Sequence, residues 1–123
     1  MVYLSKKILF VCYPRCGTCK KARTWLDNNN IEYKERDIKE DNPTKEELSL
    51  WFEKSGYPLK KFFNTSGLRY RELNLKDKLK EMSDQEQIEL LASDGMLVKR
   101  PIVVTNDIVI VGFKEEEWEN KLL

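Results

Sequence analysis

Hydrophobic and polar positions follow two different periods along the chain, and each change of period predicts a new element. Residues 8–12 form a continuous apolar run, ILFVC, which is typical of a strand buried on both faces of a parallel sheet. From about Thr18 the period becomes helical, and three asparagines at 28–30 end this helix. Residues 31–38 begin with apolar alternation and predict a second strand. Strand, helix and strand in this order predict a βαβ unit with parallel strands.

The middle of the chain is predicted to be helical. Thr44 with Glu47, and Ser83 with Glu86, have the spacing of capping boxes, so a helix is expected to begin at each site. Residues 68–79 are ambiguous, because only two leucines in that stretch have helical spacing.

The end of the chain returns to β-structure. Residues 102–104 and 108–111 are apolar runs separated by the turn candidate 106–107, and they predict an antiparallel hairpin before a final helix. The helical segment at about residues 43–94 is therefore expected to be an insert between a βαβ half and a ββα half. No repeat or linker interrupts this order, so we expect one α/β domain over residues 1–123, with a mixed sheet and flanking helices.

Composition and charge narrow the classes of function. The net charge is +1, which gives no global field to attract nucleic acid or an anionic membrane. No apolar run approaches the roughly 20 residues that span a bilayer. Residues 1–10 lack the pattern of a secretion signal, so a cytoplasmic location is expected. The sequence has no histidine, which excludes Ser-His-Asp and Cys-His hydrolases and any His-ligated metal site.

The strongest chemical signal is the motif Cys16-Gly17-Thr18-Cys19, which follows the first strand and opens the first helix. A helix N-terminus supplies free N–H groups and a positive dipole end, and both stabilise a thiolate. Basic neighbours such as Arg15 add positive potential. Cys16 is the better nucleophile because the first position is less enclosed by the helix, and Cys19 is then expected to resolve a mixed disulfide.

Two other interpretations of this cysteine pair stay open. A closed zinc site needs four ligands, and Cys12 is the only further nitrogen or sulfur ligand, so carboxylates have to complete it. In the second interpretation, the two thiols are chemically inert and are simply buried in the core. Cys12 is interpreted as a small core residue, with a second interpretation as a backdoor thiol that oxidises when Cys19 is blocked.

Arg100 and Pro101 begin the third strand. Proline is tolerated at a strand start, and because only about 5–6% of X–Pro bonds are cis, the sequence by itself predicts a trans bond. The planar guanidinium of Arg100 suits an oxyanion substrate held near Cys16. Spacing along the chain does not show that proximity.

Four stretches of the chain carry a family resemblance. They are residues 13–22 (YPRCGTCKKA), residues 64–73 (NTSGLRYREL), and LVKRPI at 97–102 with VGF at 111–113. Together they resemble the ArsC family, which includes glutaredoxin-coupled arsenate reductases and the Spx transcriptional regulators. The resemblance covers nearly the whole chain. It implies a thioredoxin-like fold with a helical insert, and a cis Pro101 that faces the redox cysteine.

The resemblance also implies roles for individual residues. In the arsenate reductases the cysteine that corresponds to Cys16 attacks arsenic, and basic residues hold the oxyanion. Arg100 matches one of those basic residues, whereas Lys60 and Phe113 occupy the other two positions, so two of three contacts differ. No cofactor is bound in such proteins, and an external thiol donor is implied: glutathione with glutaredoxin, or thioredoxin. Spx regulators carry a Cys-x-x-Cys and bind RNA polymerase rather than DNA directly.

Three hypotheses about function follow from these observations. The first is a thiol–disulfide oxidoreductase resembling glutaredoxin-coupled arsenate reductase, with Cys16 as nucleophile, Cys19 as resolving thiol and Arg100 on the anion. The second is an Spx-like redox-sensing regulator that binds RNA polymerase through a Cys16–Cys19 switch, and the third is a generic thiol protein of low turnover. The residues expected to bind substrate or shape the site are Arg15, Gly17, Thr18, Lys60 and Pro101.

Overall fold

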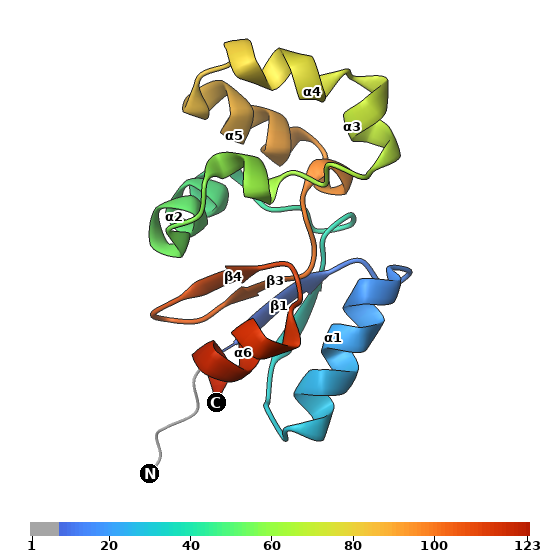
Figure 1. The fold of residues 1–123 in the computed structure, drawn as a ribbon, viewed down its shortest axis with the longest axis vertical. Coiled ribbons are helices and arrows are strands. Elements are labelled where there is room, and N and C mark those ends of the chain that lie inside the picture. Colours follow the sequence, from blue (N-terminus) through green and yellow to red (C-terminus); the bar gives the residue numbers. More distant parts are fainter. Residues whose placement is uncertain (1–7) are drawn as a thin grey trace.

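A mixed sheet forms the centre of the computed structural model, which describes residues 8–123. Residues 1–7, part of the stretch in which no secretion signal is expected, lie outside the described residues. Within residues 8–123 the strand order is β2-β1-β3-β4 (Figure 1). The strands are β1 (Leu9–Cys12), β2 (Lys34–Asp37), β3 (Ile102–Val104) and β4 (Val109–Val111). β1 is parallel to β2 and antiparallel to β3, and β3 is antiparallel to β4, so the predicted βαβ unit and hairpin are both confirmed.

One face of the sheet is covered by the helices α1 (Gly17–Asn28) and α6 (Glu115–Leu122), as Figure 1 shows. Successive side chains of a strand point to opposite faces, and Phe10 and Cys12 of β1 pack in the cluster on the α1 side. Val11, between them, belongs to the cluster on the opposite face. The buried indole of Trp118 closes the α6 side, and its Nε1–H donates to the carbonyl oxygen of Gly112 at 3.0 Å.

On the other face lies a helical layer built from the segments between β2 and β3 in the chain, of which the first, residues 45–55, packs on the sheet and the later helices extend beyond it (Figure 1). They are α2 (Lys45–Ser55), η1 (Leu59–Phe62), α3 (Leu68–Glu72), α4 (Leu75–Lys78), η2 (Leu79–Glu81), α5 (Asp84–Ser93) and η3 (Gly95–Leu97). The predicted capping boxes at Thr44 with Glu47 and at Ser83 with Glu86 are both present. These boxes satisfy N–H groups that the helix itself leaves free.

Two segments differ from the prediction for physical reasons. The second strand covers only Lys34–Asp37 rather than residues 31–38, because pairing with β1 begins where the Lys34 N–H donates to the Ile8 carbonyl oxygen at 2.8 Å. The ambiguous stretch 68–79 is broken into short helices by Asn74, whose φ of 53° lies in the left-handed region.

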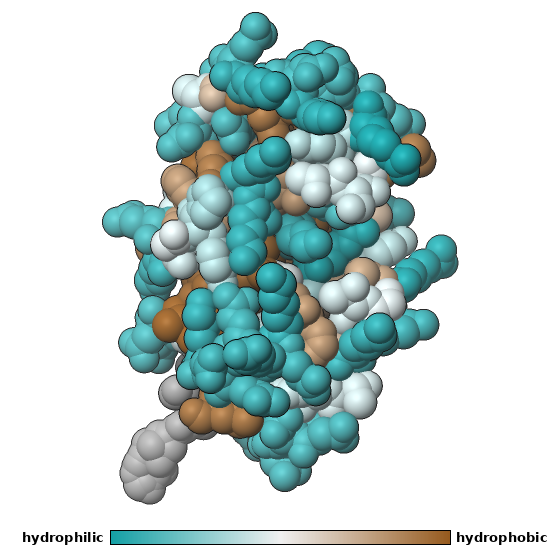
Figure 2. Space-filling view, viewed as in Figure 1, coloured by the Kyte–Doolittle hydropathy of each residue, from teal (hydrophilic) through white to brown (hydrophobic). Residues whose placement is uncertain are grey.

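The face of the molecule shown in Figure 2 is largely hydrophilic, and hydrophobic atoms show mainly in the gaps between polar side chains. Among the described residues no helix is long and apolar enough to cross a membrane.

Candidate thiol site

The site forms where the end of β1 turns into the start of α1. The Cys16 N–H donates to the Tyr13 carbonyl oxygen at 2.9 Å, which closes the turn. Cys16 is the N-cap residue of α1, with φ −81° and ψ 126°. Gly17 and Thr18 follow it and are exposed, and the space beside Gly17 is open. A substrate therefore has access to the partly buried Cys16 thiol.

The surroundings of Cys16 favour its thiolate. Partial burial acts to raise the pKa of this thiol, but the N–H groups of Cys19 and Thr18 and the side chains of Arg100 and Cys19 lower it by more. The Sγ atom makes no capping hydrogen bond. The same N–H groups nevertheless face it from the second and third helical positions and stabilise a negative charge there. The net result is a pKa below the ordinary value for cysteine.

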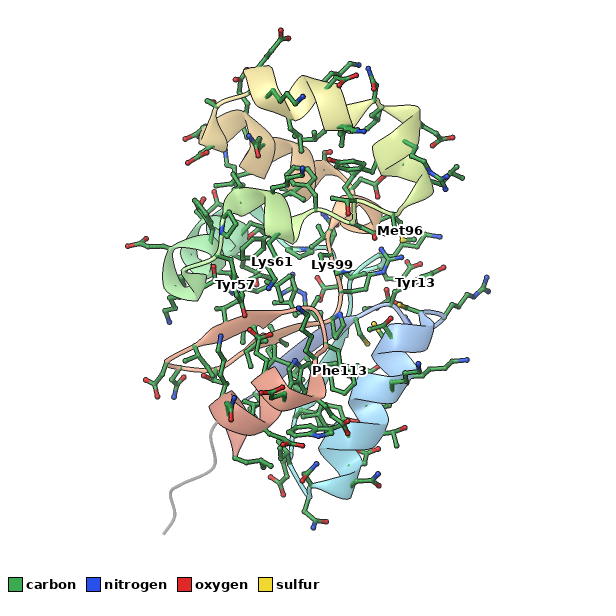
Figure 3. The ribbon with its side chains drawn as sticks, in the orientation of Figure 1. Tyr13, Tyr57, Lys61, Met96, Lys99 and Phe113 are labelled. Carbon is green, nitrogen blue, oxygen red and sulfur yellow. The ribbon has the colours of Figure 1, made fainter. Side chains whose placement is uncertain are left out.

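Arg100 is held beside Cys16 by contacts with the end of the helical layer. Its Nη1–H groups lie 3.4 Å from the Met96 carbonyl oxygen and 3.5 Å from that of Val98. Its guanidinium carbon lies 5.4 Å from the ring centroid of Tyr13, a cation–π distance. Figure 3 shows Tyr13 and Met96 where the helical layer meets the start of α1. Within residues 8–123 no carboxylate pairs with Arg100, so its charge is available to an anion at the site.

The peptide bond between Arg100 and Pro101 is cis. The base rate of X–Pro bonds predicts trans, and that prediction is wrong; the resemblance predicts cis, and that prediction is confirmed. Pro101 itself is buried.

Cys19 has the opposite character from Cys16. Its side chain is fully buried in the first turn of α1, and the Tyr13 N–H donates to its Sγ at 3.3 Å. A side-chain interaction with Cys12 and burial raise the pKa of this thiol far above its ordinary range, and negative charge on Cys16 or Cys12 adds to the effect. The two thiols of the motif are thus opposite in character, because the surroundings favour the thiolate at Cys16 and the protonated thiol at Cys19.

Cys12 is fully buried at the end of β1, as the core interpretation predicts, but it also has a charged neighbour. Arg23 approaches it with Nη2 at 3.6 Å from Sγ. Arg23 is itself fixed by two hydrogen bonds of 2.9 Å to the carboxylate of Glu35 on β2. Sequence reasoning missed the contact of Arg23 with Cys12 and Glu35. The available signal was the spacing of Arg23 from Cys19, because residues one helical turn apart lie on the same side of α1.

Arg15, Lys60 and Phe113, the other residues considered for the site, have three different surroundings. Arg15 is exposed in the turn before α1. Lys60 lines a surface pocket with Lys61 and Lys99, and Figure 3 shows these last two lysines between η1 and the sheet. Among the described residues, no hydrogen bond or ion pair joins Lys60 to Cys16. Phe113 packs edge-to-face on the buried Trp118, with 4.7 Å between ring centroids.

The zinc interpretation requires converging ligands. In the part of the chain that the structure describes, no group of three or more His, Cys, Asp or Glu side chains is placed to hold a metal ion.

Comparison with known proteins places this geometry in a family. Residues 12–121 match the sequence profile of the ArsC family. The YusI protein of Bacillus subtilis (strain 168) is 58% identical over 112 residues, which cover 91% of this chain and 95% of YusI. The global transcriptional regulator Spx of Enterococcus faecalis is 32% identical over 104 residues, which cover 85% of this chain and 77% of Spx.

Solved structures give the same grouping. An ArsC family related protein from Bacteroides fragilis has 59% sequence identity and a TM-score of 0.92, covering 95% of this chain and 98% of that one. An arsenate reductase from Vibrio cholerae has 25% identity and a TM-score of 0.85, covering 97% and 100%. The predicted α/β, thioredoxin-like fold is confirmed by these neighbours. With a profile match over most of its length and relatives of this similarity, the chain belongs to the ArsC family.

Proposed function

We propose that the chain is a thiol–disulfide redox protein resembling the glutaredoxin-coupled arsenate reductases, with Cys16 as nucleophile and Cys19 as resolving thiol. The observation that carries the proposal is the contrast between the two thiols. The Cys16 pKa is lowered at an accessible helix N-terminus, and the Cys19 pKa is raised in the interior one turn away. The thiolate is the nucleophilic form of cysteine, so reaction begins at Cys16.

The proposed reaction consists of two exchanges. The Cys16 thiolate attacks one sulfur of a substrate disulfide, the substrate S–S bond breaks, and the other sulfur leaves as a thiolate. Cys19 then loses its proton and attacks the Cys16 sulfur, which releases the second substrate sulfur and forms the Cys16–Cys19 disulfide. Once Cys16 is in a mixed disulfide it carries no negative charge, so one of the causes that raise the pKa of Cys19 is gone. Resolution is thereby favoured only after the first exchange.

Arg100 supplies the positive charge that makes this site suitable for an anionic substrate. Its guanidinium is positioned beside Cys16 and is free of carboxylate partners within residues 8–123, so it supports binding of an oxyanion such as arsenate. The two electrons that regenerate the thiols come from an external donor, glutathione with glutaredoxin or thioredoxin, and the proposal includes no bound cofactor. Such donors are cytoplasmic, which is the location we propose.

The proposal is tested by trapping thiols after mild oxidation. Wild-type protein treated with a small excess of peroxide is alkylated under denaturing conditions and analysed by mass spectrometry. In samples quenched with acid at the earliest time, we expect Cys16 and Cys19 to be protected together, and we expect both to become labelled again after incubation with thioredoxin or glutathione. The matched control is Cys19→Ser, in which Cys16 has no resolving partner and forms a mixed disulfide with added glutathione. Separate labelling of both cysteines in oxidised wild type would contradict the proposal.

A second candidate is an Spx-like redox-sensing regulator that binds RNA polymerase through a Cys16–Cys19 switch. The specific observation in its favour is that apolar Phe113 holds one of the positions that the resemblance assigns to a basic contact, and that among the described residues no hydrogen bond or ion pair joins Lys60 to Cys16. The similarity to Spx of Enterococcus faecalis supports it as well. An arsenate-reduction assay with glutathione and glutaredoxin, run beside a pulldown of RNA polymerase with reduced and oxidised protein, separates the two candidates.

A further inference from the structure

The thiol of Cys12 has no part in the reaction proposed above, yet the sheet brings it to the same site. Cys12 ends β1 on the α1 side, and Cys19 lies in the first turn of α1, in the same buried cluster. Both side chains are 0% exposed. The Cys19 thiol interacts with the side chain of Cys12 and also with that of Cys16. Cys16 packs against the cluster from the accessible side. All three thiols of the chain therefore gather in or against one cluster, with Cys19 in the helical turn that follows Cys16.

A charged pair links Cys12 to the surface. Arg23 Nη2 lies 3.6 Å from the Cys12 Sγ atom, close enough to stabilise a negative charge on the sulfur. Two hydrogen bonds of 2.9 Å hold Arg23 to Glu35, whose carboxylate also interacts with Cys12. The Glu35 side chain is 35% exposed. The Arg23–Glu35 pair therefore joins Cys12 to the partly exposed surface of β2, which gives a proton that leaves Cys12 a short route to solvent.

We infer that Cys12 is a third redox thiol, which takes over the disulfide from Cys16 and leaves a buried Cys12–Cys19 bond with Cys16 free. The inference rests on the proposed function, because it begins from the Cys16–Cys19 disulfide. It also differs from the backdoor interpretation, because the partner of Cys12 is Cys19 itself.

The transfer is an internal thiol–disulfide exchange with no net oxidation. Cys12 gives its proton to solvent, its thiolate is stabilised by Arg23, and its sulfur attacks the Cys19 Sγ. The Cys16–Cys19 bond breaks, and Cys16 leaves with the bonding electron pair as a thiolate. Exchange is faster when the leaving thiolate is better stabilised, and Cys16 has the helix N-terminus and Arg100 beside it. The direction of transfer, from the surface inward, follows from that difference.

After the transfer Cys16 is a free thiolate and again a nucleophile, while Cys12 and Cys19 remain oxidised as a disulfide. One molecule is then able to form a Cys12–Cys19 disulfide and a mixed disulfide at Cys16 at the same time.

Tryptic digestion separates the relevant cysteines, because cleavage releases Cys12 in residues 8–15 and the other two in residues 16–20. Wild-type protein is oxidised briefly with diamide, freed of oxidant, kept anaerobic, and quenched in acid at intervals before maleimide labelling. We expect the internal disulfide of peptide 16–20 to decrease while a linked pair of the two peptides appears, with maleimide on Cys16. A disulfide that stays within peptide 16–20 while Cys12 is fully labelled overturns the transfer.

Variants test the pairing independently of Cys16. Cys16→Ser keeps a good N-cap residue, and diamide is expected to produce the Cys12–Cys19 bond in it directly. In the matched control Cys19→Ser, Cys12 is expected to stay labelled. Absence of the bond in Cys16→Ser overturns the inference and leaves the proposed function intact. If wild type never forms a disulfide within residues 16–20, the proposed function fails and the transfer fails with it.

Arg23 is a positioning residue in this scheme. Arg23→Gln is expected to slow the transfer roughly tenfold, because the Cys12 thiolate loses its charged neighbour, and Arg23→Lys, which keeps a positive charge there, is expected to restore most of the rate. The control Lys21→Gln, an exposed position on the same helix, is expected to leave the rate unchanged. An unaltered transfer rate in Arg23→Gln removes Arg23 from the scheme and overturns the assignment of the Arg23–Glu35 pair.

Discussion

The guanidinium of Arg100 stands over the ring of Tyr13, 5.4 Å from its centroid, at the turn that leads into Cys16. The two residues are 87 positions apart in the sequence (100 − 13), and the antiparallel pairing of β1 with β3 brings them together. Tyr13 thus contributes to the site twice, by its ring under Arg100 and by its N–H on Cys19. These contacts hold the Arg100 guanidinium in place, unlike that of a freely solvated surface arginine, which supports the proposed role of Arg100 in binding an anion.

Arg100→Lys keeps the positive charge and removes the planar fork. A hydrogen bond to a charged group contributes about 1.5–3 kcal/mol, so we expect arsenate kcat/KM to fall roughly ten- to a hundredfold. The measurement is steady-state reduction of arsenate with glutathione and glutaredoxin. Lys99→Arg, one residue earlier, is the control. Unchanged activity in Arg100→Lys would remove Arg100 from the site, whereas an inactive wild type with an intact Cys16–Cys19 switch would favour the regulator.

The three cysteines are expected to react with iodoacetamide at rates that differ in size and in pH dependence. The lowered pKa of Cys16 means that its labelling rate reaches a plateau below the pH of an ordinary thiol. Cys19 has a raised pKa and full burial, so it is labelled far more slowly at every pH below about 9. Fragment spectra of peptide 16–20 give the two rates separately. Equal rates at Cys16, Cys19 and Cys12 would sink the assignment of the nucleophile.

The features that could be predicted from the sequence are those that depend on residues close together in the chain. The capping box at Thr44 and the helix N-terminus at Cys16 depend on residues a few positions apart, and both are found where the pattern places them. The contact of Arg23 with Cys12 depends instead on how α1 lies on β1, and Glu35 joins them only through the register of β2. Periodicity carries no information about such pairings.

The peptide bond before Pro101 is another feature that local propensity does not predict. Propensity favours trans, because the cis form has a low base rate, and only the resemblance to a family predicts the cis bond that is present. For Lys60 the resemblance predicts a role at the site, and the structure does not bring its side chain into contact with Cys16; its role stays a prediction.

The ion pair between Arg36 and Glu47 predicts a loss of stability in acid. Hydrogen bonds from Arg36 lower the pKa of Glu47 to about 2. Because the folded-state pKa lies below the unfolded value, the stabilisation is present above about pH 4.5 and is lost as the pH falls toward 2. The Glu47 side chain is 34% exposed, so solvent screening reduces the effect, and we expect Glu47→Gln to cost about 1 kcal/mol at neutral pH.

Urea unfolding at pH 7 and at pH 3 measures this contribution. The difference between wild type and Glu47→Gln is expected to shrink at the lower pH, because at pH 3 the Glu47 carboxyl of the unfolded chain is protonated while that of the folded chain is still mostly ionised. Glu46→Gln, at the neighbouring exposed position of the same first turn, is the matched control and should change stability by a few tenths of a kcal/mol. A pH-independent difference would show that Glu47 acts through packing or capping rather than through its charge.

Gly95 allows the backbone after α5 to pass against the backbone after β2. A Cβ atom at this position would lie 1.8 Å from the Ile38 carbonyl oxygen and 2.8 Å from its carbonyl carbon. Both are backbone atoms, and Ile38 is fixed by its N–H, which donates to the Cys12 carbonyl oxygen at 2.8 Å. The clash has no flexible side chain to absorb it, so Gly95→Ala is expected to cost about 3 kcal/mol or more of unfolding free energy.

The contrast is Gly17→Ala, where an added Cβ meets nothing within 4 Å. At the first position of α1 alanine is sterically free, and its lower backbone entropy in the unfolded chain predicts equal or slightly higher stability. Urea denaturation of the two variants at one pH gives the comparison directly. If Gly95→Ala unfolds at the same urea concentration as Gly17→Ala, the close approach at Ile38 relaxes at little cost. Because Ile38 hydrogen-bonds to Cys12, a destabilised Gly95→Ala is also expected to label faster at Cys12, at the inner end of the thiol cluster.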